Sequence, residues 1–190
     1  MTAPFFTGEI MDIQNTYIRV SGVMQDSIVD GPGLRYVLFT QGCKHNCKGC
    51  HNPETHDMNG GKLVTVERLL QLLDKNPLTQ GVTLSGGEPF EQPAQVVVFA
   101  REVKKRGLHL MCYSGYTLEQ LIKKGESDPG VMELLQLLDT LVDGKFILEQ
   151  RSLNLLFRGS KNQRILDVPA SLAAREAVRD AKIVGREDAL

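Results

Sequence analysis

The sequence lacks any long hydrophobic run, because nowhere do about 18 uncharged apolar residues follow one another, as a membrane-spanning helix requires. The first residues, Met1 to Phe6, lack the basic start and the apolar stretch of a secretory signal. Internal repeats, low-complexity tracts and long linkers are also missing. These absences predict a cytoplasmic protein with no membrane partner, and they give no reason to divide the chain.

An excess of charge of either sign is missing as well. The chain of 190 residues has 22 basic and 23 acidic side chains, so its formal net charge is −1. A field that attracts nucleic acid as a polyanion needs a larger basic excess, and we expect no nucleic-acid partner. The hydrophobic content of 42% is sufficient for one globular domain with its own core.

Cysteine is scarce, but three of the four cysteines, Cys43, Cys47 and Cys50, stand within eight residues. Thiolates this close can share one inorganic centre, and thiolate is the ligand that iron–sulfur clusters require. A 4Fe-4S cluster on three thiolates keeps one iron open for a substrate. The alternatives are a structural zinc with Cys112 or His51 as fourth ligand, or a disulfide, which strained loops and a reducing compartment disfavour.

The spacing Cys-x3-Cys-x2-Cys resembles the signature of the radical S-adenosylmethionine (radical SAM) enzymes. Two further motifs, Asp-Gly-Pro-Gly-Leu-Arg at 30–35 and Ser-Gly-Gly-Glu-Pro at 85–89, stand in the order found in the branch that activates glycyl radical enzymes. Near the C-terminus, segments 141–146 and 157–164 are similar to activators of anaerobic ribonucleoside-triphosphate reductases. The resemblance therefore implies an activating enzyme.

Hydrophobic patterns predict strands and helices in alternation. Short apolar runs such as Tyr36–Phe39 and Val82–Leu84 are typical of buried parallel strands, and Thr65, Pro93 and Thr117 stand where helices should begin. This alternation indicates βαβ units and a parallel sheet with every motif at the C-terminal ends of its strands. We expect an α/β fold; a closed barrel needs about 250 residues, and a flavodoxin-like open sheet is excluded by the motifs alone.

The resemblance implies a partial (β/α) barrel of the radical SAM type, with residues 1–190 as a single domain. Its core is expected at about 17–168, after an N-terminal extension at 1–16. Residues 163–168 are predicted to form the last barrel strand, and about 171–182 a C-terminal helix.

The resemblance also implies cofactor contacts. A 4Fe-4S cluster is expected on Cys43, Cys47 and Cys50, with SAM on the open iron. The turn that ends with Glu88, an ordinary strand-ending turn if taken alone, would bind the amino group of SAM through that carboxylate and the glycine backbone. His51 is expected beside the adenine. The expected SAM contacts are Gly49, Cys50, His51, Gly86, Gly87, Glu88 and Ser114.

Asp30, Gly31, Gly33 and Arg158 are expected to face the protein substrate, although the first three would by themselves suit a plain turn. Four other residues are predicted to have no functional part. Cys112 lies within a predicted strand as a small buried apolar residue. His45, His56 and His109 are predicted to be solvated or structural, without identifiable partners.

No side chain in this set can make a carbon radical by acid–base chemistry, so no catalytic side chain is expected and the cofactors carry the step. The resemblance implies reductive cleavage of SAM and hydrogen abstraction from a glycine of an anaerobic ribonucleoside-triphosphate reductase, with electrons from a flavodoxin or a ferredoxin. One alternative is an activator of the pyruvate formate-lyase type, which segments 50–53 and 60–65 favour. The other is a non-catalytic zinc or iron–sulfur binding module.

Overall fold

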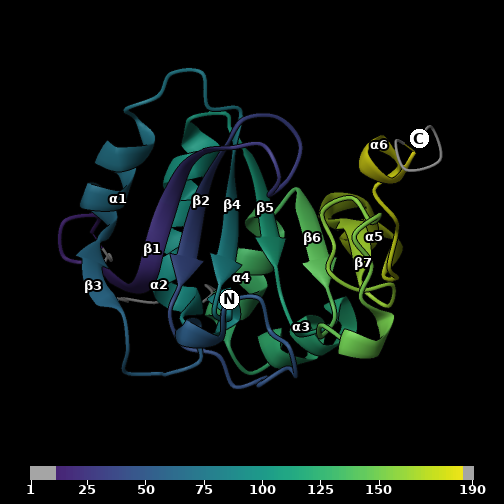
Figure 1. Ribbon diagram of the computed structural model, residues 1–190. Helices are drawn as coiled ribbons and strands as arrows, with labels where there is room; N and C mark the ends of the chain where they lie inside the picture. Colours follow the sequence, from purple (N-terminus) through teal and green to yellow (C-terminus); the bar gives the residue numbers. More distant parts are fainter. Residues whose placement is uncertain (1–11, 186–190) are drawn as a thin grey trace.

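The structure is a computed structural model that describes residues 12–185. These residues form one α/β unit around a seven-stranded mixed sheet of order β3-β1-β2-β4-β5-β6-β7 (Figure 1). The strands are β1 (Tyr17–Ser27), β2 (Arg35–Thr40), β3 (Lys62–Thr65), β4 (Gly81–Gly86), β5 (His109–Tyr113), β6 (Thr140–Asp143) and β7 (Arg164–Asp167). The helices are α1 (Val66–Leu73), α2 (Pro93–Lys105), α3 (Leu118–Gly125), α4 (Pro129–Leu137), α5 (Val168–Ala174) and α6 (Ala181–Val184), with short 3-10 turns η1 (Pro53–Thr55), η2 (Pro89–Glu91) and η3 (Leu148–Gln150).

The sheet is parallel only in its centre. Strands β2, β4, β5 and β6 run parallel, whereas β1 is antiparallel to β2 and β3, and β7 is antiparallel to β6. The predicted all-parallel sheet is therefore wrong at both edges. The segment predicted as the last barrel strand is present as β7, but no crossover helix precedes it. Without a crossover the chain cannot return to start a parallel neighbour, so β7 runs back along β6.

Helices α1 to α4 pack against one face of the sheet (Figure 1) and enclose the main hydrophobic core. Leu38, Leu84 and Cys112 point into this core from three neighbouring parallel strands and are fully buried, as is Phe99 of α2. Side chains alternate between the faces of a strand. The residues before and after these three therefore face the other side of the sheet, where the pocket lies.

The local helix signals are confirmed. Thr65 accepts a hydrogen bond from the backbone of Arg68 and caps α1, and Pro93 occupies the first turn of α2. Thr117 and Gln120 form a reciprocal capping box at the start of α3, which satisfies backbone donors that a helix end leaves unpaired.

The C-terminal part differs from the prediction of one helix at about 171–182. Two short helices, α5 and α6, stand there instead. Arg175 adopts a left-handed conformation with φ of 59°, which ends α5, and Asp180 then caps α6. Most of the expected N-terminal extension lies outside the described residues.

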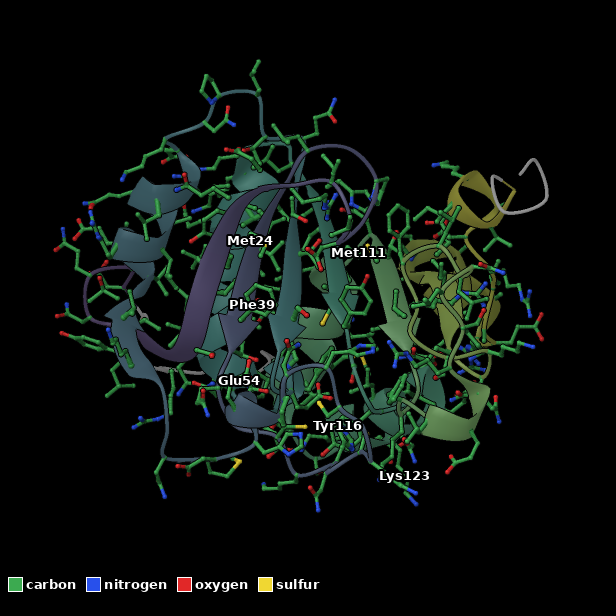
Figure 2. All side chains as sticks on the ribbon, in the orientation of Figure 1. Met24, Phe39, Glu54, Met111, Tyr116 and Lys123 are labelled. Carbon is green, nitrogen blue, oxygen red and sulfur yellow. The ribbon has the colours of Figure 1, made fainter. Side chains whose placement is uncertain are left out.

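The second face of the sheet is covered over β5 to β7, where Met111, Val142 and Ile165 pack with Ile183 of α6. Over β1 and β2 this face carries Met24 and Phe39, and Tyr116 lies beyond the strand ends (Figure 2). Within the described residues, no helix combines the length and apolar character required to cross a bilayer.

Candidate functional site

A cavity of about 550 Å³ opens at the C-terminal ends of β2, β4 and β5. Its wall brings together segments that are more than 100 residues apart in the chain, as Cys43 and Arg158 illustrate. The sequence-predicted residues on this wall are Cys43, Cys47, Cys50, His51, Gly86, Gly87, Glu88, Ser114, Asp30 and Arg158. Gly49, Gly31 and Gly33 do not line the cavity.

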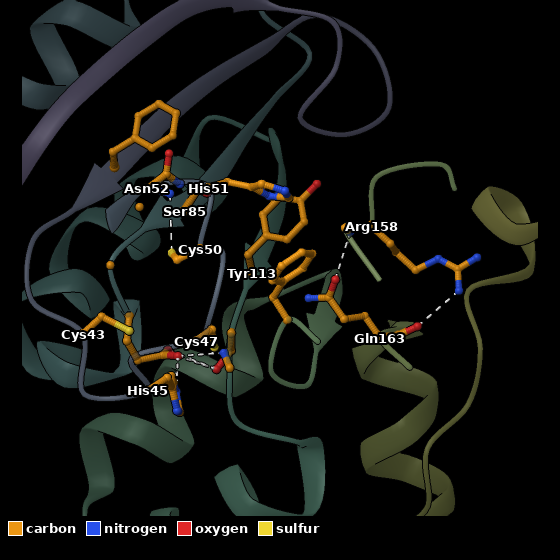
Figure 3. Close-up of a pocket in the computed structure, with 18 of the residues that line it drawn as sticks. Cys43, His45, Cys47, Cys50, His51, Asn52, Ser85, Tyr113, Arg158 and Gln163 are labelled. Carbon is orange, nitrogen blue, oxygen red and sulfur yellow. Dashed lines mark hydrogen bonds and ion pairs between the residues drawn. The ribbon is translucent and has the colours of Figure 1, made fainter. Parts of the chain in front are cut away.

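The cysteine loop leaves the end of β2 and is held closed by backbone hydrogen bonds. Gly42 donates to the oxygen of Thr55, and Cys43 donates to the oxygen of His56. The backbone of Asn52 donates to Sγ of Cys50 at 3.4 Å (Figure 3). Hydrogen bonds to cysteine sulfur are one means by which a protein tunes an iron–sulfur cluster. These hydrogen bonds therefore fix the backbone of the loop that carries the three thiols.

All four cysteines are free thiols, which excludes the disulfide alternative in this structure. Burial raises the pKa of Cys43 and of Cys47, and a bound metal would deprotonate such thiols. Three soft thiols on one cavity wall are the ligand type that an iron–sulfur cluster requires.

Cys112 cannot join that set. Its side chain is fully buried in the core under the helices, whereas its neighbour Tyr113 points to the opposite face and lines the cavity. Burial keeps the pKa of the Cys112 thiol well above its ordinary value. The predicted structural role of Cys112 agrees with this position.

Gly86 and Gly87 bring the end of β4 against the start of the cysteine loop. Gly86 has φ of 93°, and a Cβ there would stand 2.6 Å from the oxygen of Thr40. A Cβ on Gly87 would stand 2.5 Å from the oxygen of Gly42. Only glycine permits this approach. The two glycines thus let the end of β4 pack directly against the backbone of β2 and of the cysteine loop.

Glu88 lies in the wall with its carboxylate 1% exposed. It accepts hydrogen bonds from the side chains of His45 and Ser114 and from the backbone of Phe90 and Gly115. The expectation that Glu88 binds the amino group of SAM stays a prediction.

The histidines differ from their prediction. His45 has a partner, Glu88, at 2.9 Å, and His109 contacts Arg35 and Thr140 at 3.1 and 3.2 Å, so the expectation of no partners is wrong for both. His56 lines the cavity, and among the described residues its buried Nε2 has no partner. An orphaned buried nitrogen of this kind is suited to a hydrogen bond with a bound ligand.

The turn at 30–34 precedes β2 and therefore lies at the opposite ends of the parallel strands, which corrects the expectation that every motif lies at their C-terminal ends. The turn folds over the sheet, because Thr83 donates to the oxygen of Asp30 at 2.6 Å. Gly31 packs against Met111, where a Cβ would stand 2.8 Å from Sδ. Arg35 is buried beneath the turn, and this burial lowers its pKa to about 10.

Gly49 has φ of 73° and packs beside Leu148, so its position in the structure is that of a turn residue. His51 contacts Phe146, with ring centroids 4.8 Å apart. Adenine stacking on His51 stays a prediction.

Several cavity residues were missed by sequence reasoning. Tyr113 could have been found from strand alternation, since it follows the core residue Cys112. Others belong to the two C-terminal motifs, which only the fold brings to the cavity. Among these missed residues are Tyr113, Gly144, Phe146, Phe157, Gly159 and Gln163.

Known proteins resemble the chain over most of its length. The family model described as "4Fe-4S single cluster domain" matches residues 29–166. An anaerobic ribonucleoside-triphosphate reductase-activating protein of Vibrio cholerae is 39% identical over 147 residues, which are 73% of this chain and 90% of the relative. The protein of the same name from Escherichia coli K12 is 33% identical over 144 residues, 72% of this chain and 90% of the relative.

A second kind of relative also matches. The pyruvate formate-lyase-activating enzyme of Clostridium pasteurianum is 43% identical over 96 residues, but these are 48% of this chain and 40% of the relative. The reductase-activating relatives are matched over a much larger share of both chains. With three free thiols at one cavity and a family model over more than half its length, the chain belongs to the 4Fe-4S single cluster domain family and to the anaerobic ribonucleoside-triphosphate reductase-activating proteins.

Proposed function

We propose that this protein is a radical SAM oxidoreductase that installs a glycyl radical on an anaerobic ribonucleoside-triphosphate reductase. The observation that carries the proposal is the meeting of the cysteine loop, the glycine turn and the two C-terminal motifs at one cavity. Each of these motifs by itself is only weak evidence for the proposed function. Their convergence on about 550 Å³ provides room for a cluster and a nucleoside-sized ligand.

In this proposal Cys43, Cys47 and Cys50 hold a 4Fe-4S cluster. When bound, the cluster and SAM would supply the electron and the hydrogen-abstracting radical. The residues of the chain bind, orient and shield. The backbone of Gly86 and Gly87 provides close approach for SAM without side chains. Its other proposed contacts are Cys50, His51 and Ser114, whereas Gly49 would act by shaping the cysteine loop.

The apolar side chains of the cavity have a further part in the proposal. Met24, Phe39 and Phe157 line the wall and would keep water from a reactive radical. We further propose that the described mixed sheet is the partial barrel of the radical SAM fold and that residues 1–190 form one domain. Support comes from the position of the cavity at the C-terminal ends of parallel strands, the usual place of chemistry in α/β barrels.

The partner would approach the rim of this cavity. Ile28, Val29 and Leu153 are 73%, 71% and 87% exposed, and Val29 belongs to the cavity wall. Exposed apolar side chains of this kind suit a protein partner. Asp30 and Arg158 also line the cavity and would face the glycine segment, whereas Gly31 and Gly33 would act by shaping the turn. A flavodoxin or a ferredoxin would supply the electron, and the cytoplasm is the proposed compartment.

The test is anaerobic mixing of the reduced, reconstituted protein with SAM and candidate partners, followed by electron paramagnetic resonance. A glycyl radical on the reductase, absent with Cys47→Ala, is the expected result. SAM cleavage without a radical on any protein would contradict a protein substrate.

A pyruvate formate-lyase type partner is the second candidate, because the 43% identity over 96 residues to the activator from Clostridium pasteurianum is higher than the identities quoted above for the reductase activators. That match covers less than half of either chain. In the same experiment, a radical on the lyase and none on the reductase would move the assignment to this candidate. One zinc per chain in metal analysis, in place of iron and sulfide, would instead identify a non-catalytic module.

A further inference from the structure

We infer that His45 and Glu88 form a latch that fixes the cysteine loop to the ends of β4 and β5, with Glu88 acting as a positioning residue rather than as a ligand contact. His45 stands between Cys43 and Cys47 in the sequence, and its Nε2 lies 2.9 Å from Oε2 of Glu88. The inference deepens the proposed function because it concerns the proposed cluster loop, but its geometry involves no cofactor.

The carboxylate of Glu88 has no spare capacity to accept hydrogen bonds. A carboxylate has about four lone-pair positions. Four donors already occupy them, at distances of 2.8 to 3.1 Å: the imidazole of His45, the hydroxyl of Ser114, and the backbone of Phe90 and Gly115. No position is left for an ammonium group, so the charge of Glu88 is directed to the protein itself.

Both side chains of the latch are buried. The side chains of His45 and Glu88 are 8% and 1% exposed. Hydrogen bonds to a charged group are stronger than neutral ones, and breaking a buried pair leaves an unsatisfied group behind. The loss of His45 would therefore release the loop and leave Oε2 of Glu88 with donors from Ser114 and Gly115 alone.

Neighbouring residues pack closely around the imidazole of His45. The ring of His45 meets the ring of Tyr116 edge-on, with centroids 4.5 Å apart. A Cβ on Gly115 would stand 2.3 Å from Cδ2 of His45, so the glycine makes room for the imidazole. The Tyr116 hydroxyl donates to Glu91 at 2.8 Å, and Lys44 reaches the same carboxylate. Adjacent residues of the cysteine loop are thus both tied to the segment after β4.

The consequence concerns the three cysteines of the loop. A loop without helix or strand has many conformations, and ordering each residue has a substantial entropic cost. The latch removes that freedom at the middle of the Cys43 to Cys47 segment. Thiol positions are therefore set before any metal arrives.

The test uses iron-free protein, so that it stays independent of SAM, partner and cluster assembly. Each thiol is alkylated with iodoacetamide and followed by mass spectrometry. Cys112, buried in the core, reports global unfolding. His45→Phe removes the donor but keeps a ring, and Gly115→Ala displaces the imidazole without altering either partner. Gly22→Ala is the matched control, because nothing lies within 4 Å of its Cβ position.

Both latch variants are expected to alkylate at Cys43, Cys47 and Cys50 about tenfold faster than wild type, with Cys112 unchanged. His45→Gln, which retains a donor, should recover part of the protection, and Gly22→Ala should behave as wild type. In reconstituted protein, His45→Phe should also alter the cluster's paramagnetic spectrum. Unchanged rates in both variants would overturn the inference, as would equal acceleration at Cys112, which would indicate general destabilisation. If the proposed function failed but the latch were correct, the latch variants would still alkylate faster as described, and no glycyl radical would form on the reductase.

Discussion

The side-chain amide of Gln163 donates to the backbone oxygen of Gly144 at 3.1 Å. Its carbonyl accepts from the backbone of Gly159 and Ser160 at 2.9 and 3.1 Å. One side chain thus joins the two C-terminal motifs into a single wall of the cavity. The shape of each segment therefore depends in part on the other.

Replacement of Gln163 by Ala should therefore leave backbone groups in both motifs unpaired. We expect the free energy of unfolding to fall by about 1–3 kcal/mol. Urea unfolding of the metal-free protein measures this change. Asn154→Ala is the control, because Asn154 is an exposed residue of the segment between β6 and β7. Its free energy of unfolding should stay within about 0.5 kcal/mol of wild type. Equal stability of the two variants would contradict the joining role.

Cys112→Ala should leave the iron and sulfide content of the reconstituted protein unchanged, because this thiol points into the core on the opposite face of the sheet. Cys47→Ala should lose the cluster. Anaerobic iron and sulfide analysis compares the two variants. A loss in Cys112→Ala as large as that in Cys47→Ala would contradict ligation by three cysteines.

Gly87→Ala should weaken SAM binding, because its Cβ would stand 2.5 Å from the oxygen of Gly42 and push apart the two segments that form the proposed site. The expected loss in affinity is about tenfold, comparable to one hydrogen bond to a charged group. Equilibrium dialysis with labelled SAM measures it, with Gly22→Ala as the control. Wild-type affinity in Gly87→Ala would remove this turn from the site.

Stability should depend on pH through His109. Burial, followed by the charge of Arg35, lowers the pKa of His109 in the folded protein, and Nδ1 accepts from Arg35 in the neutral form. Below about pH 6.5, the ordinary value, the unfolded chain therefore binds more protons than the folded chain, and stability falls as pH falls. The other charged groups that face this ring are Asp139, Lys104 and Asp180.

His109→Gln is the matched variant, because its amide can bond to Arg35 and Thr140 but does not titrate. Urea unfolding at pH 7.5 and 5.5 should show that the free energy of unfolding falls more for wild type than for His109→Gln. The slopes of this free energy against pH should differ by up to about 1.4 kcal/mol per pH unit. Parallel curves for the two proteins would show that His109 is not responsible.

The sequence predicted those parts of the fold that depend on local signals. Thr65 and Thr117 cap helices because their hydroxyls accept hydrogen bonds from unpaired backbone donors. Such a cap depends only on residues that are close in the sequence. The direction of β7 was not predictable in this way. It depends on how residues 144–163 fold back at one end of the sheet, through contacts such as that of Gln163 with Gly144.

The candidate site shows the same division. The spacing of the three cysteines and the strand position of Cys112 were readable from the chain. The partner of His45 was not, because Glu88 is 43 residues away and its carboxylate was expected to face a ligand. Long-range pairs between polar side chains have no period in the sequence, so only the fold reveals them.

In the proposed function, hydrogen moves from a glycine of the reductase to the cofactor held by this protein. The most direct measurement uses reductase labelled with deuterium at its glycine α-carbons, mixed anaerobically with the reduced protein and SAM. Mass spectrometry of the 5′-deoxyadenosine product should show deuterium in an amount that rises with the glycyl radical signal. The Cys47→Ala variant should give neither the labelled product nor the radical. Unlabelled 5′-deoxyadenosine from a mixture that forms the radical would contradict this account.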